Sequence, residues 1–285
     1  MNLDKRLFIN VIPGKTFLDK LSGTTKVRLF FALIVLLVAT WDFRILCPIL
    51  LFSLIGLISI KPNWKLVGGL MTFIITVNIF NLFLIWMVTP DYGRSVVGGS
   101  TVLFTLTSRY IITAETLWYF LIRFTKFMAT FVVSLTFIQA ITPSEIAAGL
   151  YSIKVPYKIA TIVSIAFRYI PDISRDFADI KISMQARGME LDPKKTGLFT
   201  RLKQNILILV PLIIISFERV GNIANAMDLR GYGKGKTRTY YSEHEETKND
   251  RIIKVIYILL YISILAVIFC RVVFPPEFQV WAPWI

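Results

Sequence analysis

Sulfur and imidazole side chains are scarce in this sequence. Among its 285 residues there are two cysteines, Cys47 and Cys270, and a single histidine. The cysteines lie far apart in sequence, each inside an apolar run, so neither a disulfide framework nor a metal site is expected. No pair of acids and no nucleophile with a nearby base stands out either. We therefore predict no catalytic residue, no cofactor and no bound metal.

Acidic side chains are also few. The chain has 18 Asp and Glu against 32 Lys and Arg, which gives a formal net charge of +14 and a pI of about 9.8. Such a balance is found in nucleic-acid-binding proteins, but here the basic residues lie between and beside long apolar blocks. Membrane topology explains that placement better, and no nucleic-acid partner is predicted.

Long hydrophobic runs are abundant. Hydrophobic residues make up 55% of the chain and the mean hydropathy is +0.64, whereas soluble domains are about 45–50% apolar. A bilayer core needs about 20 apolar residues per helix. We predict five transmembrane helices, with four or six as alternatives, at residues 27–40, 45–60, 66–88, 116–141 and 252–273. The apolar stretch 100–112 is too short for an ordinary span and is read as re-entrant, interfacial or a further span.

The distribution of Lys and Arg predicts the orientation. With a cytoplasmic amino terminus, 25 of them fall in cytoplasmic segments and three, Arg44, Arg94 and Arg109, fall outside. This asymmetry follows the positive-inside rule. The expected organisation is an amino-terminal region of four spans (1–141), a cytoplasmic region (142–250), and a last span with an outer tail (251–285).

The cytoplasmic region 142–250 contains three predicted helices. Thr142 and Glu145 form a capping box that starts a short helix. Two long amphipathic helices follow, up to Arg187 and over residues 197–229, and both are expected to be half-buried at the membrane boundary. Small residues let helices cross closely, so the crossing is predicted near Gly221, Ala224 and Ala226. The predicted fold is thus an all-α polytopic membrane protein with two long crossed helices and a short one in the cytoplasm.

Both long helices end in nearly the same tripeptide. The first ends in Ala186, Arg187 and Gly188, and the second in Leu229, Arg230 and Gly231, with the two arginines 43 residues apart. Each copy alone can be an ordinary helix end, because Gly favours the left-handed cap and Arg suits the negative end of the helix dipole. The repetition favours a further role, in which each guanidinium at a rigid tip binds a groove on a partner.

With these residues in view, the chain resembles the transmembrane (T) component of energy-coupling factor transporters, which are ABC-type micronutrient importers. The second tip departs from the family pattern by having Leu229 where Ala is usual. The resemblance covers nearly the whole chain and rests on Pro13-Gly14, Leu18, Leu21, Thr25-Lys26, Thr142-Pro143, Glu145, Arg168-Tyr169-Ile170-Pro171 and the two arginine tips.

The resemblance implies a function without chemistry in this chain. Two partner ATPases, identical or different, would hydrolyse ATP and receive the tips Ala186-Arg187-Gly188 and Leu229-Arg230-Gly231. A separate small membrane protein, the S component, would bind the substrate, and the crossed helices would transmit the movement for vitamin or micronutrient uptake across the cell membrane. The transported substrate, the identity of the ATPases, and whether this chain serves one S component or several are left open.

Two alternatives compete with this interpretation. A membrane-bound enzyme could use cytoplasmic arginines to bind a phosphorylated lipid, and it would need converging acids, for which Asp172, Asp176 and Asp179 are the available cluster. Their spacing from Arg168 and Arg175 instead predicts ion pairs along one solvated helix face. The other alternative is a membrane scaffold or channel without a transport partner, although the spans carry few polar residues beyond Asn78 and Asn81.

Overall fold

The computed structural model describes residues 16–99, 101–105, 110–189, 197–235 and 247–273. In this part the chain is almost entirely helical, which confirms the predicted all-α class. It forms two compact units. One unit comprises Met1–Ile153 and Ser242–Ile285, and the other comprises Lys154–Tyr241. The region 142–250, which the sequence grouped as one domain, therefore contributes to both units.

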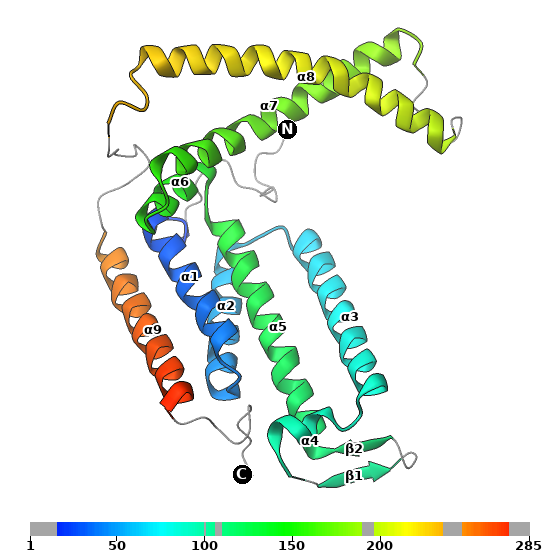
Figure 1. Cartoon of the computed structure of the whole chain (residues 1–285), viewed down its shortest axis with the longest axis vertical. Helices are drawn as coiled ribbons and strands as arrows, with labels where there is room; N and C mark the ends of the chain where they lie inside the picture. The colour runs from blue at the N-terminus through cyan, green and yellow to red at the C-terminus, as the bar shows by residue number, and fades with distance from the viewer. Residues whose placement is uncertain (1–15, 100, 106–109, 190–196, 236–246, 274–285) are drawn as a thin grey trace. The chain divides into compact units, whose positions relative to one another are not determined.

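The first unit is a helical bundle whose long helices alternate in direction along the chain (Figure 1). The short helix α6 lies at one end of this bundle, and the β1–β2 hairpin lies at the other. Its elements are α1 (Gly23–Ala39), α2 (Phe43–Ile60), α3 (Trp64–Val88), α4 (Tyr92–Val97), β1 (Val102–Thr105), β2 (Ile111–Thr113), α5 (Ala114–Ala140), α6 (Pro143–Ser152) and α9 (Lys248–Val273).

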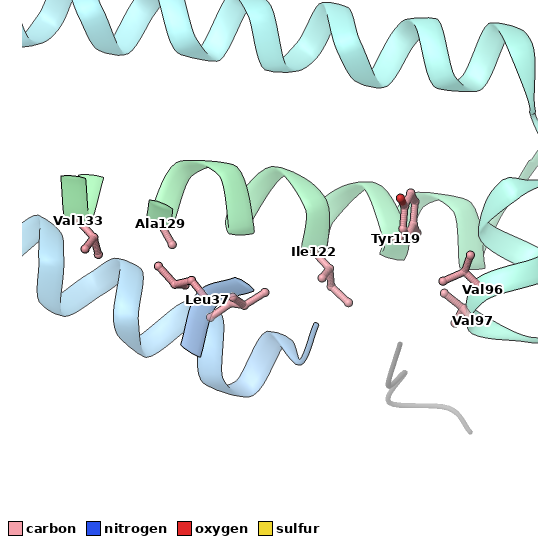
Figure 2. Close-up of a cluster of buried hydrophobic side chains, with 8 residues drawn as sticks. Leu37, Val96, Val97, Tyr119, Ile122, Ala129 and Val133 are labelled. Atoms are coloured by element: carbon pink, nitrogen blue, oxygen red, sulfur yellow. The ribbon is translucent and has the colours of Figure 1, made fainter. Parts of the chain in front are cut away.

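Helix α5 is the centre of this bundle, because α1, α2, α3 and α4 all pack against it. Its residues Tyr119, Ile122, Ala129 and Val133 recur at helical spacing and are buried on one face. In Figure 2 these side chains extend from α5 toward the neighbouring elements. Leu37 of α1 belongs to the same buried cluster. The apolar runs predicted as the first two spans, 27–40 and 45–60, do form α1 and α2.

The hairpin end of the bundle holds an element that the sequence did not predict. Residues 102–105 and 111–113 form an antiparallel two-stranded hairpin, so these parts of the stretch 100–112 are strands rather than a transmembrane helix, and residues 100 and 106–109 lie outside the described residues. Glu115, buried in the first turn of α5, accepts hydrogen bonds from the backbone N–H of Thr101 (3.0 Å) and from its hydroxyl (2.7 Å). This carboxylate fixes the start of β1 to the start of α5.

The opposite end is held by a buried ion pair between α1 and α6. The Lys26 ammonium donates to both carboxylate oxygens of Glu145 at 2.9 and 3.0 Å. It also donates to the carbonyl oxygens of Asp19 (3.0 Å) and Ala140 (2.9 Å). Glu145 accepts in addition from the N–H of Thr142, which confirms the predicted capping box. One cation therefore joins the starts of α1 and α6 to the end of α5.

Close packing at this end depends on a missing side chain. A Cβ on Gly149 of α6 would collide with the side chain of Val27 in α1, so only glycine allows the two helices this approach. Helix α9 is attached here as well. Asp250 accepts from the N–H of Ser22 at 2.9 Å and from the N–H of Thr247 at 3.0 Å. The first turn of α9 is thus bound to the residue that caps α1.

The second unit consists of α7 (Tyr157–Ala186) and α8 (Leu198–Leu229), which pack against each other. With 30 and 32 residues they are the two longest helices in the described chain. Pro171 and Pro211 lie inside them without ending them. At about 1.5 Å per residue each helix is roughly 45–48 Å long, which agrees with the two long helices that the sequence predicts.

Five helices of the described chain are long and apolar enough to cross a membrane: α2, α3, α5, residues 202–229 of α8, and residues 249–269 of α9. The number of candidate spans agrees with the prediction, but the helices that make up the five are not all the predicted ones. Helix α1, with 17 residues, is shorter than each of these, whereas α8 is among them despite its predicted place at the membrane boundary. The length and apolar character of these helices make the chain a multi-pass membrane protein.

The buried Lys26–Glu145 pair gives a first prediction. Lys26→Met leaves the Glu145 carboxylate buried without its cation, which should lower the free energy of unfolding by about 3–5 kcal/mol. The measurement is thermal unfolding of the detergent-solubilised protein. The control is Arg175→Gln, which breaks the exposed pair with Asp172 (3.6 Å) and should cost less than about 1 kcal/mol. Equal losses from the two changes would contradict the prediction.

Candidate functional site

The first candidate tip is the end of α7, which closes in a Schellman motif. Gly188 has φ 89° and donates its N–H to the carbonyl of Gln185 at 3.0 Å. Met189 donates its N–H to the carbonyl of Met184 at 3.1 Å. These two bonds satisfy carbonyls that have no partner within the helix. Arg187 is the last residue before the chain leaves the helical axis.

The end of α8 repeats this geometry. Gly231 has φ 69° and donates to the carbonyl of Asp228 at 2.9 Å, and Tyr232 donates to the carbonyl of Met227 at 2.9 Å. Arg230 has φ −84° and ψ 5°, compared with −84° and 11° for Arg187. The similarity of the two tripeptides therefore extends to backbone conformation and capping bonds.

Both tips are open to binding. Ala186, Arg187 and Gly188 are exposed, as are Leu229 and Arg230. Leu229 is 90% exposed, which is costly for a large apolar side chain in water. No described residue pairs with either guanidinium. Each tip thus presents an available cation on a backbone that its glycine holds in place.

Contact between α7 and α8 includes an ion pair that the sequence did not predict. Arg219 of α8 donates to the Asp176 carboxylate of α7 at 2.6 Å, and its guanidinium lies 5.8 Å from the ring centre of Tyr169. On α7 itself the ion pair is Arg175–Asp172, which differs from the expected pairings of Arg168 with Asp172 and of Arg175 with Asp179. Two of the three acids in the cluster, Asp172 and Asp176, thus form ion pairs with arginines of the same unit.

The small residues predicted for the crossing do not make close contacts here. Gly221, Ala224 and Ala226 are all exposed. A Cβ added to Gly221 would meet no atom within 4 Å. Their role in the crossing stays a prediction, and the observed contact uses Arg219 instead.

An aromatic pair connects the second tip to the start of α7. The rings of Tyr157 and Tyr232 are 5.9 Å apart and nearly perpendicular, an arrangement that aromatic rings prefer. Tyr232 is also the residue whose N–H closes the α8 cap. The pair therefore links the backbone next to Arg230 to the other helix of the same unit.

Two cations inside α5 have structural partners. Lys126 donates to the carbonyls of Val38 and Thr40, both at 3.1 Å, and lies 4.0 Å from the ring centre of Trp41. It thereby satisfies carbonyls at the end of α1. Arg123 donates to the Tyr119 hydroxyl at 2.8 Å. Among the described residues no group of three or more His, Cys, Asp or Glu is placed to hold a metal ion.

Comparison with protein families identifies the chain. The family model described as "CbiQ: Cobalt transport protein" matches residues 14–241, which is well over half of the sequence. The chain belongs to the CbiQ family. Its matched region includes both arginine tips and every element from α1 to α8.

Curated relatives refine this assignment. The energy-coupling factor transporter transmembrane protein EcfT of Bacillus selenitireducens is 26% identical over 263 residues, covering 90% of this chain and 94% of the relative. EcfT of Lactococcus lactis subsp. cremoris is 26% identical over 276 residues, covering 92% and 96%. EcfT of Limosilactobacillus fermentum is 35% identical over 112 residues, covering 39% and 41%.

These matches confirm the resemblance seen in the sequence. This CbiQ-family chain is a transmembrane component of the energy-coupling factor transporter type, and it is a transport component rather than an enzyme. The alternative of an enzyme acting on a phosphorylated lipid is also weakened, because Asp172 and Asp176, two of the three acids in its cluster, form ion pairs with arginines.

The caps generate a second prediction. An L side chain costs about 1–2 kcal/mol in the left-handed conformation, so Gly188→Ala and Gly231→Ala should each loosen their tip. Since about 1.4 kcal/mol corresponds to a factor of ten in an equilibrium, amide exchange at Met189 or Tyr232 should become about tenfold faster. Hydrogen–deuterium exchange read by mass spectrometry measures this.

The matched control is Gly221→Ala in the interior of α8. There the backbone is helical and the space is open, so alanine should stabilise the helix by up to about 1 kcal/mol. Unchanged exchange at both tips in the Gly188 and Gly231 variants would show that the caps do not hold the tips.

Proposed function

We propose that this chain is the coupling subunit of an energy-coupling factor importer. It transmits the ATP-driven movement of two ATPase subunits to a small integral-membrane S component, which binds a vitamin or another micronutrient. The observation that carries the proposal is the pair of arginine tips, which have a similar sequence pattern, the same cap and an exposed arginine each. Two matching ends suit two matching partners.

The chemistry of each tip fits a groove on a protein. A guanidinium has five N–H donors in a planar fork, so it can bind a carboxylate or several carbonyl oxygens at once. The left-handed glycine after each arginine turns the chain away and leaves the arginine at the helix end. At the second tip, exposed Leu229 offers a larger apolar surface than Ala186 offers at the first tip. The two partner grooves are therefore expected to differ at this position.

The lengths of α7 and α8 suit the transmission of movement. Pro171 and Pro211 each remove one backbone hydrogen bond, but both helices continue past them. Displacement at a tip is therefore carried along a helix of roughly 45 Å. The exposed apolar side chains along α8 then provide a surface for the S component or for lipid. They include Ile206, Leu209, Val210, Ile213, Ile214, Phe217 and Val220.

The proposed orientation has the amino terminus and the tips in the cytoplasm and the carboxyl terminus outside. It is supported by the 25 to 3 distribution of Lys and Arg. The ATPases would then meet the tips on the side where ATP is available. ATP hydrolysis is assigned to those partners, since the sequence offers no set of acid, base and nucleophile for it.

The substrate class is assigned to the S component rather than to this chain. The matching family is described as a cobalt transport protein, whereas the names of the EcfT relatives specify no substrate. Buried polar side chains in the described bundle, such as Lys26, Glu145 and Glu115, bind other parts of the chain. A micronutrient, either a metal ion or a vitamin, is therefore expected to bind elsewhere in the complex.

Reversing the charge of both tips tests this proposal. Arg187→Glu with Arg230→Glu replaces each multidentate donor by a carboxylate, and it should abolish recovery of the ATPases with a tagged chain from solubilised membranes. Arg175→Glu is the matched control, because Arg175 is also an exposed arginine of α7, with 77% of its side chain accessible. The control should retain the ATPases, and an intact complex with the double variant would refute the docking role.

A further inference from the structure

The Asp176–Arg219 pair has a position along the helices that the sequence pattern alone does not explain. Asp176 lies 11 residues before Arg187, and Arg219 lies 11 residues before Arg230. At about 1.5 Å per residue, Arg187 is about 17 Å along α7 from Asp176, and Arg230 is about 17 Å along α8 from Arg219. The interhelical bond therefore lies at the same distance from both tips.

The surroundings of Arg219 indicate why a charge is needed there. The face of α8 toward the interior of the unit carries Ile208 and Leu212, both buried, and then half-buried Ser216, Arg219, Ile223 and Met227. Their spacing of three and four residues defines one helix face. Among these six residues Arg219 alone is charged, and the facing helix supplies Asp176.

An apolar face by itself does not specify how two long helices are aligned. Leucine and isoleucine pack nearly as well after a shift of one turn, whereas a partly buried charge pair is satisfied in one register only. About three-quarters of each side chain is buried, and the Arg219 Nη1 atom has no hydrogen-bond partner among the described residues. A shift of one turn would leave the rest of the guanidinium and the carboxylate unpaired as well.

We propose that the Asp176–Arg219 ion pair is the fixed point of the two long helices and gives them arms of equal length to the two arginine tips. This inference rests on the proposed function and deepens it. When two ATPases approach each other symmetrically, equal arms convert equal displacements at Arg187 and Arg230 into one rotation about the ion pair. Without the pair, the helices slide along their apolar face and the displacement is lost.

The test uses the complete complex with spin labels on both helices. Ile182 and Asn225 are exposed and lie five residues before each tip, so the labels are attached through Ile182→Cys and Asn225→Cys in a background where Cys47 and Cys270 are changed to Ser. The distance between the labels is measured by pulsed electron paramagnetic resonance, without nucleotide and with ATP and orthovanadate. The unchanged pair should give one narrow distance that shifts when nucleotide is added.

Three variants separate an effect on the register of the two helices from effects on protein stability and on ATPase docking. Asp176→Asn, and the double change Asp176→Leu with Arg219→Leu, should still recover the ATPases but broaden the distance and reduce the nucleotide-dependent shift by about half or more. The charge swap Asp176→Arg with Arg219→Asp should restore a narrow distance and the shift. Asp172→Asn, in the exposed pair on the same helix, is the control and should have no effect.

Two results would overturn the inference. One is a wild-type distance and shift in the double leucine variant, and the other is a charge swap that is no better than Asp176→Asn. If instead the unchanged chain recovers no ATPase, the proposed function fails. The role of the pair is then decided by the nucleotide-free distance alone, which must be narrow in the wild type and broad in the double leucine variant.

Discussion

Transmission of movement through a helix requires that the helix end at a defined residue. A helix end leaves carbonyl groups unpaired, and an end that frays cannot carry a load at its last side chain. In this chain Gly188 and Gly231 solve that problem in the same way, by adopting a left-handed conformation that pairs those carbonyls. The exposure of Arg187 and Arg230 on firm ends depends on these two glycines, and so does every role assigned to α7 and α8.

The Lys26–Glu145 and Asp176–Arg219 pairs differ in how completely their charges are hydrogen-bonded. In the bundle, Lys26 is surrounded by four acceptor oxygens, so that the cost of removing an ammonium from water is offset by bonds to α6 and α5. In the other unit, Arg219 retains a buried nitrogen without a partner in the described residues. A fully satisfied pair suits a static joint, and a partly satisfied pair suits a joint about which helices rotate.

Sequence reasoning succeeded where a signal is local. Helix periodicity, the capping box of Thr142 and Glu145, and the two Arg-Gly ends are written in consecutive residues, and all have counterparts in the structure. It failed where partners are distant in sequence. Lys26 meets Glu145 across 119 positions and Arg219 meets Asp176 across 43, and local spacing instead suggested pairs within α7. The strands β1 and β2 were missed because they are short, with four and three residues, and lie in an apolar stretch.

One regularity in the sequence becomes visible once the long-range pair is known. The spacing of 43 residues between Arg187 and Arg230 recurs between Asp176 and Arg219. In antiparallel packing of two helices joined by a loop, contacting residues approach one another in sequence as the loop is neared, so equal spacings are not a consequence of the packing. Asp176 and Arg219 have opposite charge and lie at equal distances from the two repeated tips, and the proposed equal arms rest on this regularity.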